Sequence, residues 1–140
     1  HVSFVLVGHA EKARAHFVNV PNVYLLGRVD YRRVPQLLAH SNVGLIPFDV
    51  QNHRALVDAI NPIKLYEYCA AGLPTVATAW SELSALKAPI KLCSNRAEFI
   101  NNISKAIEEP ADRTELKSFA SRFDWRSIFR DFCQFLEIEQ

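Results

Sequence analysis

The sequence predicts an α/β protein built on a doubly wound parallel sheet of about five strands, with helices on both faces and a helical C-terminus. Short apolar runs rich in β-branched residues alternate with segments of helical periodicity, and the first two runs end in a glycine, at Gly8 and Gly27. Continuous apolar runs are typical of strands that a parallel sheet buries on both faces. Their alternation with helices favours right-handed strand-helix units, which is a Rossmann-like order.

The elements follow from these patterns in chain order. The expected strands are residues 2–7, 23–26, 43–47, 75–78 and 90–93. The helical patterns cover residues 11–17, 34–40, 62–71, a short stretch near 82–86, and then 97–108, 112–122 and 125–137. In the last helix, apolar residues recur at three- and four-residue steps, so this stripe needs a partner surface. We expect it to pack on the protein's own sheet, and the alternative is that part of it docks elsewhere in the full-length protein.

The carboxyl ends of the strands are the expected place for a ligand, because doubly wound sheets bind ligands outside that edge. Gly8, Gly27 and the corner at Pro47 and Phe48 fall there, and Arg28 directly follows the second strand. We therefore count Phe48 and Arg28 among the candidate binding residues. For Arg28, a solvated loop is the alternative interpretation.

Length and composition indicate one domain over residues 1–140, since 140 residues with 49% hydrophobic content suffice for one sizeable core. The formal net charge of +1 comes from well-mixed signs, which argues against nucleic acid as a main partner. Cys69, Cys93 and Cys133 are widely spaced among apolar residues and are expected to be free thiols in a reducing compartment. No apolar run approaches the roughly 20 residues of a membrane span, so we expect a cytoplasmic location.

The segment from residue 61 to residue 77 predicts a capped helix, a tight stop and a buried strand. Asn61 suits the N-cap, and Pro62 suits the first helical position because its missing N–H is no loss there. Gly72 fits the left-handed residue that ends a helix, and Pro74 prevents continuation.

Two charges in the opening turns of this helix indicate an anion site. Lys64 and Glu67 lie about 60° apart around the helix axis, and the other side chains of the helix are mostly apolar. The free N–H groups of Ile63 and Lys64, the positive end of the helix dipole and the lysine ammonium converge where a phosphate can bind. Glu67 lies one turn deeper as an acceptor for hydroxyl groups. A phosphorylated sugar or nucleoside fits this pattern, whereas the alternative is an ordinary ion pair between Lys64 and Glu67 on a solvated face.

Residues 49–60 show no clear period and precede the helix, so we expect a mobile loop over the ligand. Arg54 is a candidate contact for a phosphate or a sugar in this segment. His53 fits a neutral surface role better.

The stretch NPIKLYEYCAAGLPTVAT resembles the donor-binding segment of bacterial group 1 glycosyltransferases, which are enzymes of the GT-B type with two Rossmann-like domains. The order of elements fits over nearly the whole chain. The resemblance implies that Glu67 binds the ribose hydroxyls of a nucleotide sugar, and that Lys64 and the helix N-terminus, with Asn61, Pro62 and Ile63, serve the diphosphate. Lys64 and Glu67 are then the residues closest to catalysis.

One departure from the family concerns a second glutamate, which many members carry eight residues before the first and which contacts the donor sugar. Ala59 stands at that position here, and the adjacent Asp58 is the possible substitute. The sugar contact and the choice between retention and inversion therefore stay open.

The resemblance implies a hexosyltransferase of polysaccharide biosynthesis whose donor is a nucleoside-diphosphate sugar, with no cofactor or metal required. The acceptor site is then supplied by an N-terminal domain before His1, so the 140-residue chain alone is expected to be inactive. Peripheral membrane contact is left open for the full-length protein. A sugar-nucleotide epimerase of the same architecture and a non-catalytic interaction module are the alternatives. The dinucleotide fingerprint, the Walker loop and the paired carboxylates of receiver domains are absent.

Overall fold

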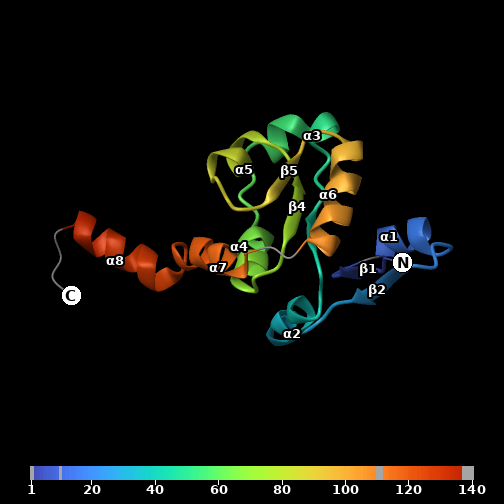
Figure 1. Ribbon diagram of the computed structural model, residues 1–140, viewed down its shortest axis with the longest axis horizontal. Helices are drawn as coiled ribbons and strands as arrows, with labels where there is room; N and C mark the ends of the chain where they lie inside the picture. Colours follow the sequence, from blue (N-terminus) through green and yellow to red (C-terminus); the bar gives the residue numbers. More distant parts are fainter. Residues whose placement is uncertain (1, 10, 110–111, 137–140) are drawn as a thin grey trace. The chain divides into compact units, whose positions relative to one another are not determined.

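The computed structural model describes residues 2–9, 11–109 and 112–136. Within these ranges the chain has five strands, all paired in parallel, and eight α-helices (Figure 1). This confirms the predicted α/β class with its Rossmann-like alternation. The chain divides into two compact units, His1–Leu37 and Leu38–Gln140, which we describe separately. The expected single domain over residues 1–140 stays a prediction.

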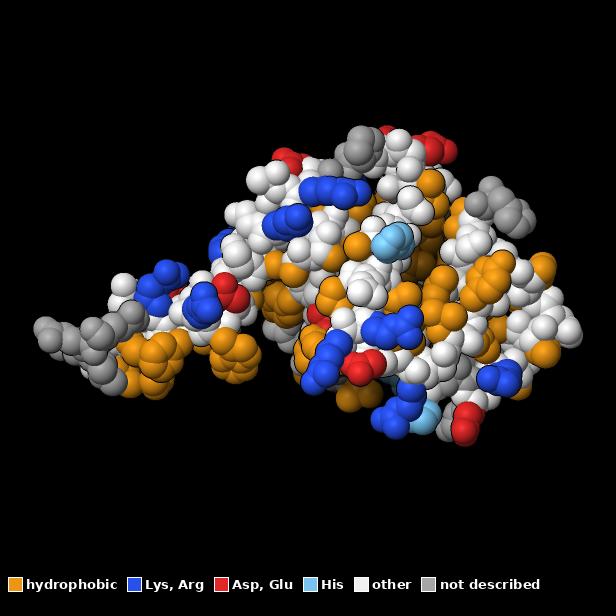
Figure 2. Space-filling model, turned by 90° about the horizontal axis from the view of Figure 1, so that it is seen from below, with side chains coloured by type: hydrophobic (Ala, Val, Ile, Leu, Met, Phe, Trp, Pro, Cys, Tyr) orange, Lys and Arg blue, Asp and Glu red, His pale blue; other side chains and the backbone are white. Residues whose placement is uncertain are grey.

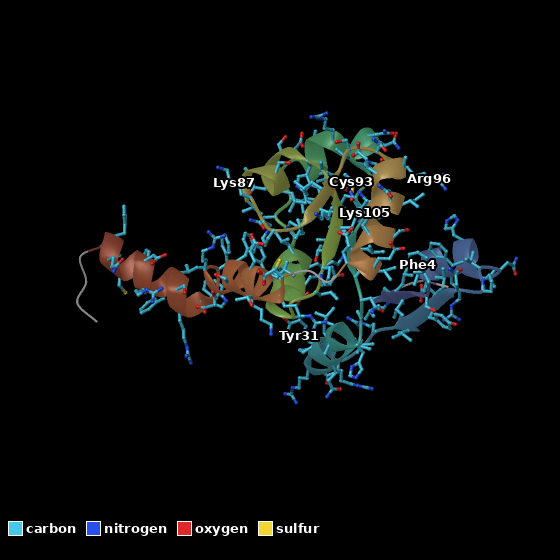
Figure 3. All side chains as sticks on the ribbon, in the orientation of Figure 1. Phe4, Tyr31, Lys87, Cys93, Arg96 and Lys105 are labelled. Atoms are coloured by element: carbon cyan, nitrogen blue, oxygen red, sulfur yellow. The ribbon has the colours of Figure 1, made fainter. Side chains whose placement is uncertain are left out.

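The first unit holds a two-stranded parallel sheet. In chain order it contains β1 (Phe4–Val7), α1 (Glu11–Phe17), β2 (Val23–Gly27) and a 3-10 turn, Tyr31–Arg33, after which α2 (Val34–Ala39) crosses into the second unit. Phe4 and Tyr31 mark the beginning of β1 and of the turn (Figure 3). Side chains alternate between half-buried and exposed along both strands, because successive residues of a strand face opposite sides of the sheet.

The second unit holds a three-stranded parallel sheet of order β3-β4-β5. Its elements are β3 (Gly44–Ile46), α3 (Val50–Val57), α4 (Ile63–Ala70), β4 (Thr75–Thr78), α5 (Ser81–Ala85), β5 (Lys91–Cys93), α6 (Arg96–Glu108), α7 (Arg113–Ser121) and α8 (Trp125–Phe135). Cys93 ends β5 just before Arg96 begins α6 (Figure 3). The five predicted strands are therefore present but hydrogen-bonded as two sheets within the described residues, rather than as the one sheet that we expected.

The core of the second unit lies around β4. Val76 and Ala77 are adjacent in β4 and completely buried, so both faces of this strand are covered. Helix α6 packs on β4 and β5, whereas α4 packs on β3, β4 and α7. Leu65 and Cys69 are the completely buried residues of α4, and burial raises the pKa of the Cys69 thiol to about 11. The spacing of these two residues by four positions places one side of α4 in the core.

We expected residues 49–60 to be a mobile loop over the ligand. This prediction is wrong, because most of the segment forms α3. Asp49 caps this helix by accepting a hydrogen bond from the Asn52 backbone N–H at 3.1 Å. The helix is kinked at His53, whose φ of −130° and ψ of 32° are not helical. An irregular helix with one buried residue, Val57, has too short an apolar face to produce a period in the sequence.

Helix α8 is amphipathic but its apolar side is exposed, contrary to the expectation that it packs on the sheet. Figure 2 shows hydrophobic side chains on one side of α8 and basic side chains on the other. Trp125 and Phe135 are 84% and 83% exposed, and Cys133 is the buried residue of the helix. Among the described residues, no helix has both the length and the apolar character needed to cross a bilayer.

Candidate functional site

The predicted anion site lies at the first turns of α4. The helix begins at Ile63, with Pro62 in an extended conformation at the N-cap and no side chain bonded to the cap position. In the described part of the chain, the backbone N–H groups of Ile63 and Lys64 have no acceptor. The first N–H group of this helix with a backbone acceptor is that of Leu65, which donates to the Pro62 carbonyl at 3.0 Å. Helix starts leave such donors for capping groups, water or ligands. The start of α4 therefore presents free donors of the kind that bind anions at helix N-termini.

Lys64 and Glu67 are not paired with each other. Lys64 is exposed and Glu67 is half-buried, and the ion pairs among the described side chains are Arg54 with Asp58 and Arg130 with Asp131. The alternative interpretation of Lys64 and Glu67 as a mutual ion pair is thus not what the structure contains. Both charges remain available on the same side of α4.

The N-cap expectation for Asn61 is wrong by one residue. Asn61 Oδ1 accepts a hydrogen bond from the Tyr66 hydroxyl at 2.9 Å, and among the described residues no side chain makes a capping hydrogen bond to the helix. Pro62 consequently occupies the N-cap rather than the first helical position. The sequence favoured Asn61 because asparagine has a strong local preference for the N-cap position. In the structure, the Tyr66 hydroxyl one turn into the helix donates to the Asn61 side-chain oxygen instead.

The predicted stop after α4 is confirmed. Gly72 has a φ of 67°, the left-handed conformation that glycine adopts without steric cost. The Leu73 N–H donates to the Tyr68 carbonyl at 2.9 Å and the Gly72 N–H to the Cys69 carbonyl at 2.9 Å. These two bonds resemble a Schellman-type C-cap and lead the chain directly into β4.

The carboxyl edge of the second sheet joins Phe48 to the end of β4. The Phe48 N–H donates to Thr78 Oγ1 at 3.1 Å, and the Thr78 hydroxyl donates to the Phe48 carbonyl at 3.1 Å. The Phe48 ring meets Trp80 edge-on, with ring centroids 5.2 Å apart. The predicted corner therefore lies at the sheet edge that usually receives ligands, although its ring is engaged with an aromatic neighbour.

Asp58, the proposed substitute for the missing glutamate, already serves as a structural acceptor. Its Oδ1 accepts hydrogen bonds from the Ser81 N–H at 3.2 Å and the Ser81 hydroxyl at 3.1 Å. The Ser81 backbone N–H and, less strongly, the Arg54 charge hold the pKa of Asp58 below its ordinary value. Asp58 thus caps the start of α5 from a distant part of the chain.

The two predicted arginines lie in different places. Arg54 is in α3 and its Nε is 3.3 Å from Asp58 Oδ2, with the side chain 75% exposed. Arg28 belongs to the first unit, where it borders a cavity of about 450 Å³ at the carboxyl ends of β1 and β2. That cavity is lined by Gly8, His9, Glu11, Arg14, Leu25, Gly27 and Arg28. Asn61, Pro62, Ile63, Lys64 and Glu67 are therefore the predicted residues that the structure brings together.

Sequence reasoning missed two residues that shape this region. Tyr66 holds Asn61, and Trp80 donates its indole N–H to the Ile60 carbonyl at 2.9 Å. The Trp80 bond fixes Ile60, three residues before the start of α4, while Trp80 itself is 3% exposed. A bulky aromatic residue directly before the start of α5 was the available signal for Trp80. No signal in the sequence marked Tyr66.

The chain is similar in sequence to known glycosyltransferases. Residues 1–109 match the family described as glycosyl transferases group 1. The chain is also similar to the putative teichuronic acid biosynthesis glycosyltransferase TuaH of Bacillus subtilis (strain 168), at 26% identity over 130 residues. That alignment covers 88% of this chain and 32% of TuaH, so the chain spans about a third of the length of this relative. Since the family match covers well over half of the 140 residues, the chain belongs to the group 1 glycosyltransferases.

Proposed function

We propose that this chain is the donor-binding domain of a two-domain hexosyltransferase and binds a nucleoside-diphosphate sugar. The observation that carries the proposal is the first turn of α4, where two N–H groups and the charges of Lys64 and Glu67 lie together, all without partners among the described residues. Family membership supports glycosyl transfer as the reaction class. The name of TuaH refers to teichuronic acid biosynthesis, which supports our proposal of a role in polysaccharide biosynthesis.

The proposed chemistry uses Lys64 and the α4 terminus as electrostatic groups. Negative charge grows on the nucleoside diphosphate as the bond to the sugar breaks. A lysine ammonium and oriented N–H groups stabilise that charge without reorganisation, which lowers the barrier. Glu67 accepts hydrogen bonds from the ribose hydroxyls and thereby fixes the donor's position. The site that binds the acceptor belongs to a separate N-terminal domain, so the 140-residue chain alone binds the donor without transferring the sugar.

The test compares Lys64→Ala and Glu67→Ala by calorimetric titration with a nucleoside and with its diphosphate. We expect Lys64→Ala to weaken the diphosphate far more than the nucleoside, and Glu67→Ala to weaken both comparably. Hydrogen bonds to charged groups contribute roughly 1.5 to 3 kcal/mol, so each loss is about tenfold to a hundredfold in affinity. Ligands are chosen first from a thermal-shift panel of UDP-, GDP-, ADP- and TDP-sugars.

Lys105→Ala is the matched control, because Lys105 is an exposed lysine of α6 far along the sequence from α4 (Figure 3). It removes one positive charge from a helix that packs on β4 and β5, so its effect measures the general electrostatic contribution. Equal losses for Lys64→Ala and Lys105→Ala, or unchanged affinities for both Lys64→Ala and Glu67→Ala, would contradict the proposed donor site.

A further inference from the structure

Helix α4 starts one residue later than its own sequence favours. Asn61 followed by Pro62 is a strong combination for an N-cap and a first helical residue. In that arrangement Ile63 and Lys64 are the second and third helical residues, whose N–H groups the Asn61 side chain caps. In the structure Pro62 has φ of −83° and ψ of 120°, and no side chain caps the helix. Something must therefore hold Asn61 away from these two N–H groups.

The Tyr66 hydroxyl is the group that holds it. This hydroxyl donates a hydrogen bond to Asn61 Oδ1 at 2.9 Å. The Tyr66 ring is stacked on Phe119 of α7 at 6.1 Å between centroids, and it lies 5.0 Å from the ring of Phe123. The Arg122 guanidinium covers both phenylalanine rings, at 5.1 and 5.8 Å from their centroids. The Tyr66 ring thus packs against α7 and the residues that directly follow it. This packing fixes the position of the hydroxyl that is hydrogen-bonded to Asn61.

We propose that Tyr66 is a positioning residue of the donor site, because it keeps the start of α4 open for a diphosphate. By holding Asn61 Oδ1 at the Tyr66 hydroxyl, the hydrogen bond keeps the Asn61 side chain in a position from which it does not cap the N–H groups of Ile63 and Lys64. This inference rests on the function proposed above and assigns a role to a residue that touches no ligand itself.

The proposal implies a competition for the same two N–H groups. Without the Tyr66 hydroxyl, Asn61 is free to cap them, and a diphosphate must then displace the cap before it binds. Ligand affinity falls as a result, whereas the free protein gains a cap in exchange for the lost hydrogen bond. A residue with a merely structural role gives the opposite pattern, since its loss lowers stability.

Tyr66→Phe in the 140-residue chain tests the competition, because it removes the hydroxyl and retains the ring that stacks on α7. We expect the affinity for the best ligand among UDP, GDP, ADP and TDP to fall about fivefold, the usual contribution of an N-cap converted to affinity. The affinity for the corresponding nucleoside and the Tm are expected to stay at their wild-type values. Tyr68→Phe is the control, since among the described residues the hydroxyl of this half-buried tyrosine has no hydrogen-bond partner.

A second variant decides between competition and simple damage. Asn61→Ala added to Tyr66→Phe removes the competing cap, so we expect the double variant to bind the diphosphate more tightly than Tyr66→Phe alone. Wild-type affinity in Tyr66→Phe, or a double variant that binds no better than Tyr66→Phe, overturns the inference while leaving the donor site intact. If the wild-type chain binds none of the four diphosphates, or if Lys64→Ala has no effect, the proposed function fails and the inference fails with it.

Discussion

Gly44 is the position at which the packing of α4 on the sheet can be tested most directly. A Cβ atom built on Gly44 would clash with Cδ2 of Tyr68 and lie 2.8 Å from its Cε2 and Cγ. Ordinary contact begins at 3.4 Å, so the ring must retreat by well over half an ångström. Tyr68 belongs to the same helix as Lys64 and Glu67, which means that the clash is transmitted to the candidate site.

Two opposing effects set the magnitude for Gly44→Ala. Gly44 is not among the glycines with positive φ, so alanine fits its backbone and gains about 0.4 to 1 kcal/mol by restricting the unfolded chain. Overpacking in a close-packed region costs about 1 to 3 kcal/mol. The steric effect wins, and we expect a net loss of about 1 to 2 kcal/mol, which lowers the Tm by roughly 3 to 7 °C. Thermal and urea denaturation measure both values.

The refuting result is a Gly44→Ala variant that is as stable as the wild type or more stable. The control is the same substitution in a Tyr68→Ala background, where the ring is absent and the clash disappears. There the backbone effect alone remains, so Gly44→Ala is expected to become neutral or slightly stabilising. A cost that persists without the ring would mean that the Tyr68 contact is not its source.

Two further predictions concern the contacts between residues 58–60 and residues 80–81. Trp80→Phe removes the indole N–H that bonds to the Ile60 carbonyl, and it should lower the free energy of unfolding by about 1 to 3 kcal/mol in urea denaturation; an unchanged value would show that this bond is not formed. Asp58 has a lowered pKa because it accepts hydrogen bonds from Ser81, so its contribution to stability is present above its unfolded pKa and is lost as the pH falls through its folded pKa. Thermal denaturation from pH 5 to pH 2 should therefore show a shallower acid-induced loss in Asp58→Asn than in the wild type, and identical slopes would contradict this reasoning.

The strands and most helices could be predicted because their signals are local. Residues 75–78 and 11–17 were predicted with the observed bounds, since in both cases the apolar run or helical period lies within the segment itself. The division of the strands into two sheets could not be predicted in this way. Strand pairing depends on contacts between distant residues, and nothing in a single strand's sequence specifies its neighbour.

Helix α3 was missed for a related reason. This helix is stabilised at its N-terminus by the Asp49 cap and at its C-terminus by hydrogen bonds that Asp58 accepts from Arg54 and Ser81. Only Val57 of this helix is buried among the described residues. A helix held by its two ends rather than by an apolar face has no hydrophobic period to read.

The candidate site was predictable to the extent that it lies within one helical turn. Ile63, Lys64 and Glu67 are brought together by helix geometry alone, so the sequence sufficed to place them on one side of α4. The contacts of Phe48, Asp58 and Trp80 link segments 20 to 30 residues apart. Those contacts depend on the fold as a whole, and local preferences carry no information about them.

The N-cap of α4 is the most instructive wrong prediction. Asparagine does favour the N-cap position, and yet Asn61 does not occupy it. Capping by asparagine typically contributes about 0.5 to 2 kcal/mol, and the chain leaves this stabilisation unused at a helix whose N-terminus carries an adjacent lysine. The Tyr66 hydrogen bond to Asn61 offsets this loss. Sequences that break a strong local rule usually do so where function demands it. An uncapped terminus beside Lys64 is a poor choice for a structural helix and a suitable one for a helix that must accept a diphosphate.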